Sequence, residues 1–286
     1  MLFKIKKGLD IPLKGRPDER IDVATDVKTV AVLGSDYIGL KPTMLVREGD
    51  QVKVGTPLFE DKKNPGVIVT SPAAGTVAAI NRGAKRALVS VVIAVDGDEA
   101  EAFACKEVAA ASEADVRKVM QESGLWVAFR TRPYGKIPAV DSSANSIFVN
   151  AMDTNPLAVD PAVIINERAT DFALGVSILT KFEVPVYVCQ SDTAELPSLS
   201  GNAVKTARFS GKHPAGLGST HVHHIDPVFA QKTVWTIGYQ DVIALGALFN
   251  QGKLDVSRYV ALAGPLVNSP RVFKTVSYTH LRAHET

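Results

Sequence analysis

Two patterns of hydrophobic and polar positions divide the chain. Over residues 1–98, short apolar runs alternate with turns that contain Gly or Pro, which is typical of short antiparallel strands. Over residues 99–275, apolar runs of strand length alternate with stretches whose apolar positions recur every three or four residues. We therefore expect a multi-domain α+β protein with an all-β domain over 1–98 and an α/β domain over 99–275.

The strand-and-turn pattern is densest over residues 46–77, VREGDQVKVGTPLFEDKKNPGVIVTSPAAGTV. Its turns are EGD, GTP and the corner SP, and its two halves are expected to wrap into one small closed sheet. Further strands are predicted as a pair over 2–13, at 27–33 and at 88–95.

The string EGDQVKVGTPLFEDK followed by SPAAGTV resembles the barrel-sandwich hybrid of biotinyl and lipoyl carrier domains. In those carriers a lysine at the tip of a tight hairpin takes the cofactor. The corresponding turn here, 61–66, holds Lys62 and Lys63, is longer than the carrier turn and has Pro65 just past its tip. The sequence therefore favours a plain solvated turn over a modified lysine, and a carrier fused to an α/β domain remains an alternative.

The α/β pattern begins with a capping box, Ser112 to Asp115, which predicts a helix that ends near Gly124. Asp160 and Pro161 start a second helix, which is expected to run to about Leu179. The remaining predictions are strands at 146–149, 184–189, 234–237 and 259–263 and a helix at 241–250. This order implies a parallel or mixed sheet covered by helices. Residues 276–286 follow no periodicity and are interpreted as a non-native tail.

Composition narrows the function classes. The chain has 286 residues, 46% of them hydrophobic, and a net charge of +2. Its two cysteines, Cys105 and Cys189, lie far apart with no CxxC spacing, so neither a disulfide framework nor an iron–sulfur site is indicated. There is no apolar run of about 18 residues and no signal peptide, so we expect attachment to a membrane only through a partner. No broad basic field suggests nucleic acid.

The loop FRTRPYGKIP, residues 129–138, interleaves cations with aromatic rings, and its Pro and Gly residues keep it irregular. Guanidinium groups and ring faces suit a planar, electron-rich ligand such as a quinone headgroup, or an acidic partner. An interdomain linker with surface ion pairs is the alternative. The loop 34–42 carries Tyr37 and Leu40, which either tuck under the barrel or contact a ligand.

A second candidate is SGKHPAGLGSTHVHHID, residues 210–226. It fails as a phosphate loop, because His213 follows Gly-Lys, and it holds only two glycines of a dinucleotide fingerprint. His213, Gly216 and Gly218 are its candidates for cofactor binding. His221 and His223, on one face if this is a strand, are candidates for metal binding, with hydrogen-bonded structural histidines as the alternative. No motif supplies a catalytic residue.

Several segments together are similar to the A subunits of the bacterial Na⁺-translocating NADH:quinone reductases: KIKKGLDIP, residues 46–83, FRTRPYGKIPA, residues 210–227 and GPLVNSPRV. The resemblance implies a peripheral subunit on the cytoplasmic side of the bacterial inner membrane, in a complex that passes electrons from NADH to ubiquinone and exports Na⁺. It implies a second domain like the flavoprotein subunit of complex I. Those relatives use a glycine-rich flavin loop and cluster cysteines, which are incomplete or missing here, so no bound flavin or cluster is expected and NAD and flavins are assigned to partner subunits.

The resemblance also implies further domains, a ubiquitin-like fold and a helical end, beyond the residues present. It implies a binding subunit that is not catalytic in isolation and that either helps to shape a quinone-accessible cleft or buttresses a membrane subunit that holds the quinone. The candidates for quinone contact are Tyr37, Leu40, Phe129, Arg130, Arg132, Tyr134 and Lys136, chosen by chemical type. A stand-alone flavin or NADH dehydrogenase module that uses residues 210–226 is the alternative.

Overall fold

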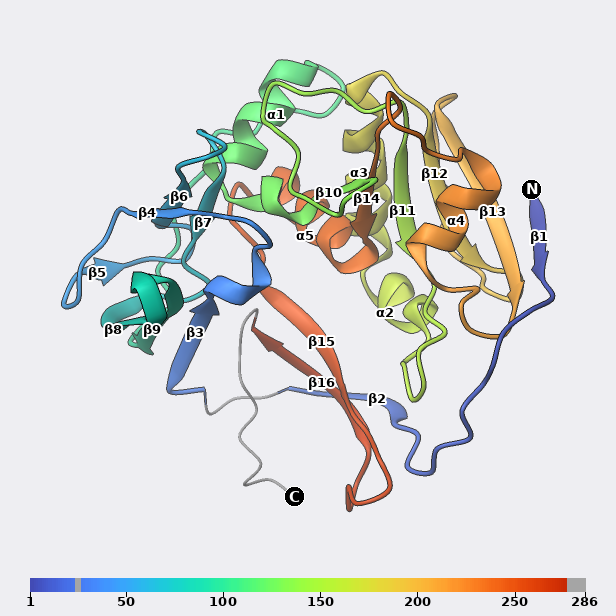
Figure 1. Ribbon diagram of the computed structural model, residues 1–286, viewed down its shortest axis with the longest axis horizontal. Helices are drawn as coiled ribbons and strands as arrows, with labels where there is room; N and C mark the ends of the chain where they lie inside the picture. Colours follow the sequence, from blue (N-terminus) through green and yellow to red (C-terminus); the bar gives the residue numbers. More distant parts are fainter. Residues whose placement is uncertain (24–26, 277–286) are drawn as a thin grey trace.

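The computed structural model describes residues 1–23 and 27–276. Its first domain consists of a four-stranded sheet in the order β3–β9–β8–β5 and a three-stranded sheet in the order β4–β6–β7 (Figure 1). The bounds are β3 (Thr29–Leu33), β4 (Pro42–Met44), β5 (Gln51–Val52), β6 (Pro57–Asp61), β7 (Ile68–Thr70), β8 (Gly75–Arg82) and β9 (Leu88–Val95). The predicted barrel-sandwich hybrid is confirmed.

Alternation along the strands builds the core of this domain. Leu58 of β6 is fully buried. Along β9, Val91 and Ile93 are fully buried, and Val92 between them is only half-buried. Gly66, with a φ of 89°, turns the chain between β6 and β7, a conformation that residues with a Cβ rarely adopt.

The second domain is built on a six-stranded sheet in the order β1–β13–β12–β11–β14–β10, parallel except for β10. The strand bounds are β1 (Leu2–Ile5), β10 (Arg130–Arg132), β11 (Ile147–Ala151), β12 (Val186–Ser191), β13 (Val204–Gly211) and β14 (Val234–Gly238). The helix bounds are α1 (Glu113–Glu122), α2 (Pro161–Glu167), α3 (Ala169–Leu179), α4 (Gly218–Ile225) and α5 (Tyr239–Gln251). The expected sheet covered by helices is confirmed.

The two faces of this sheet carry different cores. Ile147 and Val149 of β11 pack with α1, α2, α3 and α5 on one face, and Phe148, between them, packs toward α4 on the other. The capping box is present, since the Ser112 hydroxyl accepts from the Asp115 amide and the Asp115 carboxylate accepts from the Ser112 amide. The single helix predicted up to Leu179 is two helices, because Arg168 leaves helical geometry (φ −116°, ψ 38°).

The N-terminal segment departs from the prediction. Residues 2–13 contain one strand instead of a pair, and that strand, β1, lies parallel to β13 at the edge of the α/β sheet. Phe3 stacks on Phe209 of β13 with 4.9 Å between ring centroids. The alternation of Phe3 and Ile5 predicts a strand but does not say which sheet it joins.

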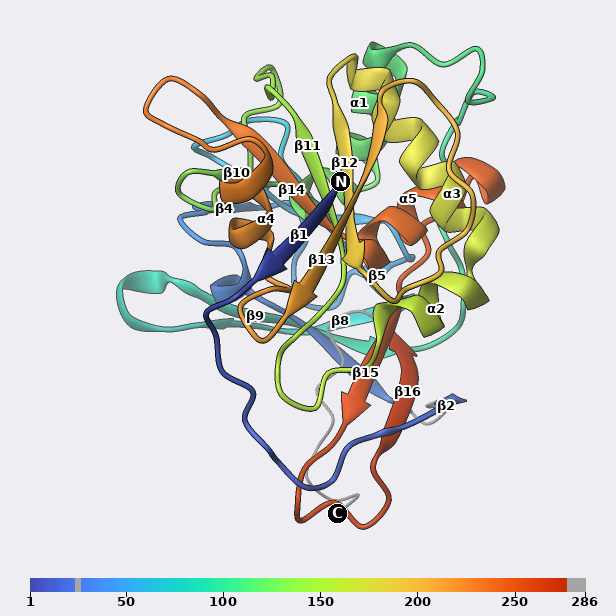
Figure 2. The ribbon, with the colours of Figure 1, turned by 90° about the vertical axis from the view of Figure 1, so that its right-hand side faces the viewer.

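The strand predicted at 259–263 also joins another sheet. β15 (Ser257–Leu262), β16 (Arg271–Val276) and β2 (Asp18–Val23) form a separate sheet in the order β15–β16–β2. Figures 1 and 2 show it beyond the α/β domain, beside the N-terminal segment that leads into β2. The predicted tail begins at Val276, which is the last residue of β16. Residues 277–286 lie outside the described residues.

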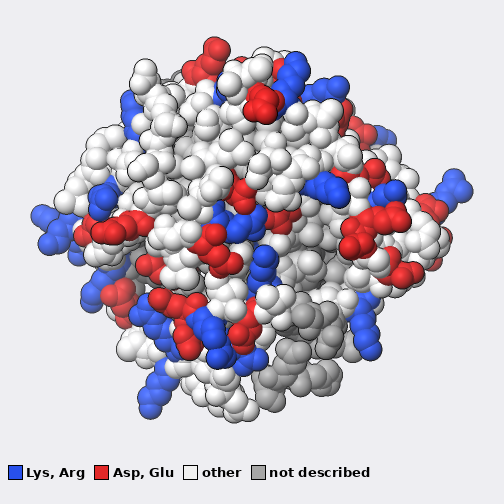
Figure 3. Space-filling view, turned by 180° about the vertical axis from the view of Figure 1, so that it is seen from behind, with Lys and Arg blue, Asp and Glu red and all other residues white. Residues whose placement is uncertain are grey.

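Within the described ranges, every helix is too short or too polar to cross a membrane. On the face seen in Figure 3, the basic and acidic side chains are interspersed and form no broad field of one sign.

Candidate functional site

A cavity of about 530 Å³ lies between the barrel-sandwich domain, the α/β domain and the segment that leads into β15. The first domain contributes Asp36, Tyr37 and residues 69–72 to its lining. The α/β domain contributes Ser123, Gly124, Leu125, Val127, Ala128, Arg130, Arg132, Asn150, Gly218, Thr236, Ile237, Gly238 and Asp241, and the last segment contributes residues 254–256 and Arg258.

The sheet topology explains where this cavity lies. In the sheet, β11 lies between β12, which is the next strand along the chain, and β14, which comes later in the chain. The strand order therefore reverses at β11. Such a reversal of strand order leaves a crevice at the carboxyl ends of the two strands. Asn150 and Gly238, which line the cavity, occupy those ends of β11 and β14.

The first domain closes one wall of the crevice. Tyr37 is 3% exposed, packs its ring edge-on against Phe59 at 5.9 Å, and lines the cavity as well. The Thr70 hydroxyl donates to the carbonyl of Ser123 at 2.9 Å and so ties β7 to the α/β domain. Gly124 permits this approach, since a Cβ there would lie 2.7 Å from the Thr70 hydroxyl oxygen.

The loop predicted at 129–138 is irregular only in its later part, because Pro133 and Gly135 come after Arg130–Arg132, which form the strand β10. Both arginines of β10 line the cavity. Arg130 is half-buried, and its Nη1 donates to the carbonyls of Val127 and Phe129, which fixes the guanidinium. Arg132 is half-buried as well, and its Nε is buried without a partner among the described residues. Both guanidinium groups therefore lie in the cavity wall, where their remaining N–H groups can donate hydrogen bonds to a ligand.

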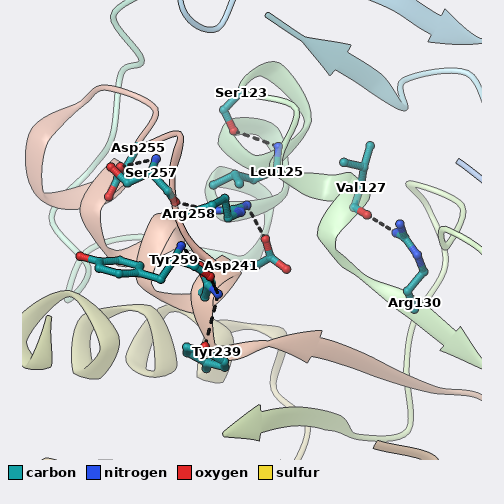
Figure 4. A network of polar contacts seen from close by, with 11 residues as sticks. Ser123, Leu125, Val127, Arg130, Tyr239, Asp241, Asp255, Ser257, Arg258 and Tyr259 are labelled. Atoms are coloured by element: carbon teal, nitrogen blue, oxygen red, sulfur yellow. Dashed lines mark hydrogen bonds and ion pairs between the residues drawn. The ribbon is translucent and has the colours of Figure 1, made fainter. Parts of the chain in front are cut away.

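The opposite wall holds a paired arginine. Arg258 Nη2 donates to Asp241 Oδ1 at 2.6 Å. Gln240 fixes this part of β15, because its side chain accepts from the Tyr259 amide at 2.8 Å and donates to the Tyr259 carbonyl at 3.1 Å. Figure 4 shows the Arg258–Asp241 pair on one side and Arg130 with Val127 on the other.

Three of the seven candidates for quinone contact line the cavity: Tyr37, Arg130 and Arg132. Phe129 is fully buried, with its ring 5.1 Å from that of Trp235 and 5.4 Å from that of Trp126. The other three lie outside the lining: Leu40 is half-buried against the barrel core, Tyr134 is 81% exposed and Lys136 is exposed.

The histidine segment forms helix α4, so the expectation of a strand is wrong. Two residues along a helix point roughly 200° apart, and His221 is fully buried while His223 is exposed. In the described ranges no group of three or more His, Cys, Asp or Glu is placed to hold a metal ion. The eight-residue segment is helical because Val222 and His221 pack against the sheet, where the His221 ring lies 4.3 Å from that of Phe209.

Of the candidates for cofactor binding, only Gly218 lines the cavity. His213 Nδ1 lies 3.1 Å from the Thr154 hydroxyl, and the Gly216 amide donates to the same hydroxyl at 2.9 Å. These two residues therefore hold the loop before α4 against the end of β11.

His221 should make stability depend on pH. Burial lowers its pKa to about 4, while the hydrogen bond to the Ala215 carbonyl raises it in part. Between the unfolded pKa of about 6.5 and the folded value, only the unfolded chain binds the proton, so stability is lost as pH falls through this window, by about 3 kcal/mol in total.

We expect the free energy of unfolding, measured by urea titration at pH 6.5, 5.5 and 4.5, to fall more steeply in the parent than in His221→Gln. The matched control is His223→Gln, which removes an exposed histidine from the same helix and should keep the parent slope. An unchanged slope in His221→Gln would contradict the assignment.

The carrier-type turn is docked on the second domain. The Asn64 side chain donates to the Pro138 carbonyl at 3.0 Å, and Lys63 Nζ donates to the Gly39 carbonyl at 3.3 Å. Lys62 and Lys63 are both exposed. A carrier lysine needs a hairpin tip that is free to move between sites, whereas this turn is hydrogen-bonded to the second domain through Asn64, next to Lys63.

Sequence reasoning missed most of the cavity lining. Thr70, Ser123, Asn150, Thr236, Asp241 and Arg258 come from separate segments of the chain. Asn150 had a usable signal, because it is a polar residue at the end of a predicted buried strand. The pairing of Asp241 with Arg258 has none, since it depends on how β15 lies against α5.

Comparison with known proteins identifies both domains. The family model for the NqrA N-terminal barrel-sandwich hybrid domain matches residues 3–96, and the model for the NqrA second alpha/beta domain matches residues 111–254. The A subunit of the Na⁺-translocating NADH-quinone reductase of Actinobacillus succinogenes is 54% identical over 283 residues, which is 98% of this chain and 63% of that protein. Its counterpart in Saccharophagus degradans is 54% identical over 278 residues, 96% of this chain and 62% of that protein.

The counterpart in Neisseria meningitidis serogroup B is 52% identical over 279 residues, 96% of this chain and 62% of that protein. This chain thus spans less than two thirds of the length of these relatives. Because both family models and the relatives agree over nearly all of its residues, the chain belongs to the NqrA family, the A subunits of the Na⁺-translocating NADH-quinone reductases.

Proposed function

We propose that this chain serves as a binding subunit of a Na⁺-translocating NADH:quinone reductase and forms part of a quinone site in the cavity between its two domains. It would lie on the cytoplasmic side of the bacterial inner membrane against a membrane subunit. In this proposal ubiquinone is the substrate, and hydride and flavin chemistry takes place on partner subunits. The names of the relatives support the assignment to the complex.

The observation that carries the quinone proposal is the composition of the cavity. Its volume of about 530 Å³ lies within the range of about 300–1,000 Å³ that small-molecule sites occupy. Leu125, Val127 and Ile237 offer apolar contact to a ring, and Arg130 and Arg132 offer donors to its carbonyl oxygens. A quinone headgroup needs both.

The proposal predicts that Arg132→Ala weakens binding of a short-chain ubiquinone by about tenfold, because one charged donor is lost. The measurement is equilibrium dialysis of the purified 286-residue chain against ubiquinone-1. Tyr134→Ala is the matched control, since Tyr134 belongs to the same loop but is 81% exposed and lies outside the cavity lining. Equal affinities for the parent and Arg132→Ala would refute a quinone contact at this residue.

A flavin or NADH module is the second candidate function, and Gly218 favours it by bringing the start of α4 to the cavity. Absorbance of the purified protein separates the two functions, because a bound flavin gives a yellow protein and a quinone site does not. An intact mass without an adduct on Lys62 or Lys63 would in turn argue against a carrier function.

A further inference from the structure

The charges that line the cavity do not balance locally. The charged lining residues are Asp36, Arg130, Arg132, Asp241, Asp255 and Arg258. Two of the three carboxylates already have cationic partners: Asp241 pairs with Arg258 at 2.6 Å, and Asp255 pairs with Arg168 at 2.7 Å. These pairs add little net charge to the cavity.

The charges left over are Arg130, Arg132 and Asp36. Arg130 donates to two main-chain carbonyls and meets no carboxylate within the described ranges. The side chain of Arg132 makes no hydrogen bond and no ion pair with any described residue, and its Nε is buried. Asp36 is exposed, so water screens its charge, while both arginines are half-buried. The remaining potential in the cavity is therefore positive.

The start of α4 adds to this potential. Gly218, its first residue, lines the cavity, and the first turn of α4 contains no acidic residue. The unpaired amides of a helix N-terminus carry a partial positive charge, which here has no compensating carboxylate on its own helix.

A cation held partly out of water without a counterion favours a ligand that brings one. The planar guanidinium presents its donors in a fixed fork, which suits an oxygen anion in the plane of a ring. A neutral carbonyl oxygen accepts the same hydrogen bonds but leaves the charge uncompensated.

We propose that this cavity selects the anionic form of its ring ligand, with Arg130 and Arg132 holding a ring oxygen anion such as that of an ionised hydroxyquinone. This inference rests on the proposed quinone site and names the charge state that the site prefers. It makes the two arginines determinants of ligand selectivity as well as contacts.

The test compares two probes of nearly equal shape, 2-hydroxy-1,4-naphthoquinone, whose hydroxyl is ionised at neutral pH, and 2-methoxy-1,4-naphthoquinone, which cannot ionise. Equilibrium dialysis of the full chain at about pH 7.5 should show the hydroxy probe binding about tenfold more tightly, the factor expected for one charge-assisted hydrogen bond. In Arg132→Gln, the two affinities should come within about twofold of each other, mainly through weaker binding of the hydroxy probe.

Arg130→Gln is the second variant, and it should also reduce the preference. Arg82→Gln is the control, because Arg82 is an exposed residue of the barrel that lies outside the cavity lining. Thermal unfolding of each variant verifies that it is folded before binding is compared.

The possible results separate the two proposals. Equal binding of both probes to the parent would overturn the selectivity and leave the quinone site standing, as would an undiminished preference in both arginine variants. Binding of neither probe would overturn the selectivity, and binding of neither probe nor ubiquinone-1 would overturn both proposals. A preference that is lost in the arginine variants and kept in Arg82→Gln would support the inference.

Discussion

Alanine at position 246 is expected to destabilise the chain by about 3 kcal/mol or more, at the upper end of the range for overpacking. Gly246 lies in α5 where that helix crosses α3, and a Cβ there would lie 1.8 Å from the carbonyl oxygen of Asp171 and 2.9 Å from the amide nitrogen of Gly175. Both contacts are with backbone, so no side chain can move aside. The two helices would have to separate, which would loosen the core beneath them.

Urea unfolding of Gly246→Ala against the parent measures this loss. The control is Gly218→Ala, because a Cβ at position 218 would meet only the Thr236 methyl group, at 3.9 Å. That variant should be as stable as the parent, or slightly more so, since alanine favours a helix. Parent-like stability in Gly246→Ala would mean that α3 and α5 do not meet backbone to backbone.

Replacement of Arg168 by methionine is expected to cost about 3–5 kcal/mol, the range for removing one partner of a buried ion pair. Arg168 stands between α2 and α3, and its guanidinium meets Asp171 Oδ2 at 2.9 Å and Asp255 Oδ2 at 2.7 Å. The three side chains are at most 16% exposed, so the two carboxylates would be left partly desolvated and unpaired.

The loss should depend on pH in a definite direction. Burial raises the pKa of Asp255, but the Ser257 amide and the Arg168 guanidinium lower it by more, so its pKa in the folded parent lies below the usual value. A lowered carboxyl pKa stabilises the fold above the unfolded value of about 3.9 and ceases to do so as pH falls below it. The difference between Arg168→Met and the parent should therefore be largest near neutral pH and shrink as the pH falls through that value.

Arg20→Met is the matched control for this measurement. Arg20 pairs with Asp22 at 3.2 Å, but its side chain is 66% exposed, so its loss should change the free energy of unfolding by less than about 1 kcal/mol. Similar losses in the two variants, or a loss in Arg168→Met that does not vary with pH, would contradict a desolvated Arg168 network.

Features that neighbouring residues determine were predictable from the sequence. The capping box at Ser112, the strand at 146–149 and the helix at 241–250 are all present, because caps, alternation and helical periodicity act within a few residues. The partner of a strand is decided elsewhere. The local pattern correctly indicates strands at residues 2–5 and 259–263. It does not indicate that they pair with β13 and β16, so both strands were expected in the wrong sheet.

The residues of the candidate site, too, were predictable from the sequence only in part. Chemical type alone points to Tyr37, Arg130 and Arg132, and the fold brings them to one cavity from two domains. Phe129 is aromatic, like Tyr37, but it is fully buried. The side chains of β10 and of the turn before it point in different directions, and only some of them face the cavity. The strand expected at the histidines is wrong because alternation over eight residues fits a strand, while packing of Val222 and His221 favours a helix.

The pairing of β1 with β13 has a consequence for synthesis on the ribosome. Leu2 is opposite Arg208, so β1 leaves the exit tunnel some two hundred residues before the strand that it pairs with is translated. At elongation rates of about 5–20 residues per second, β1 has no partner for about 10–40 s. During that interval the backbone groups of β1 lack the strand that they pair with in the folded domain, and β1 can join the sheet only after β13 has been made.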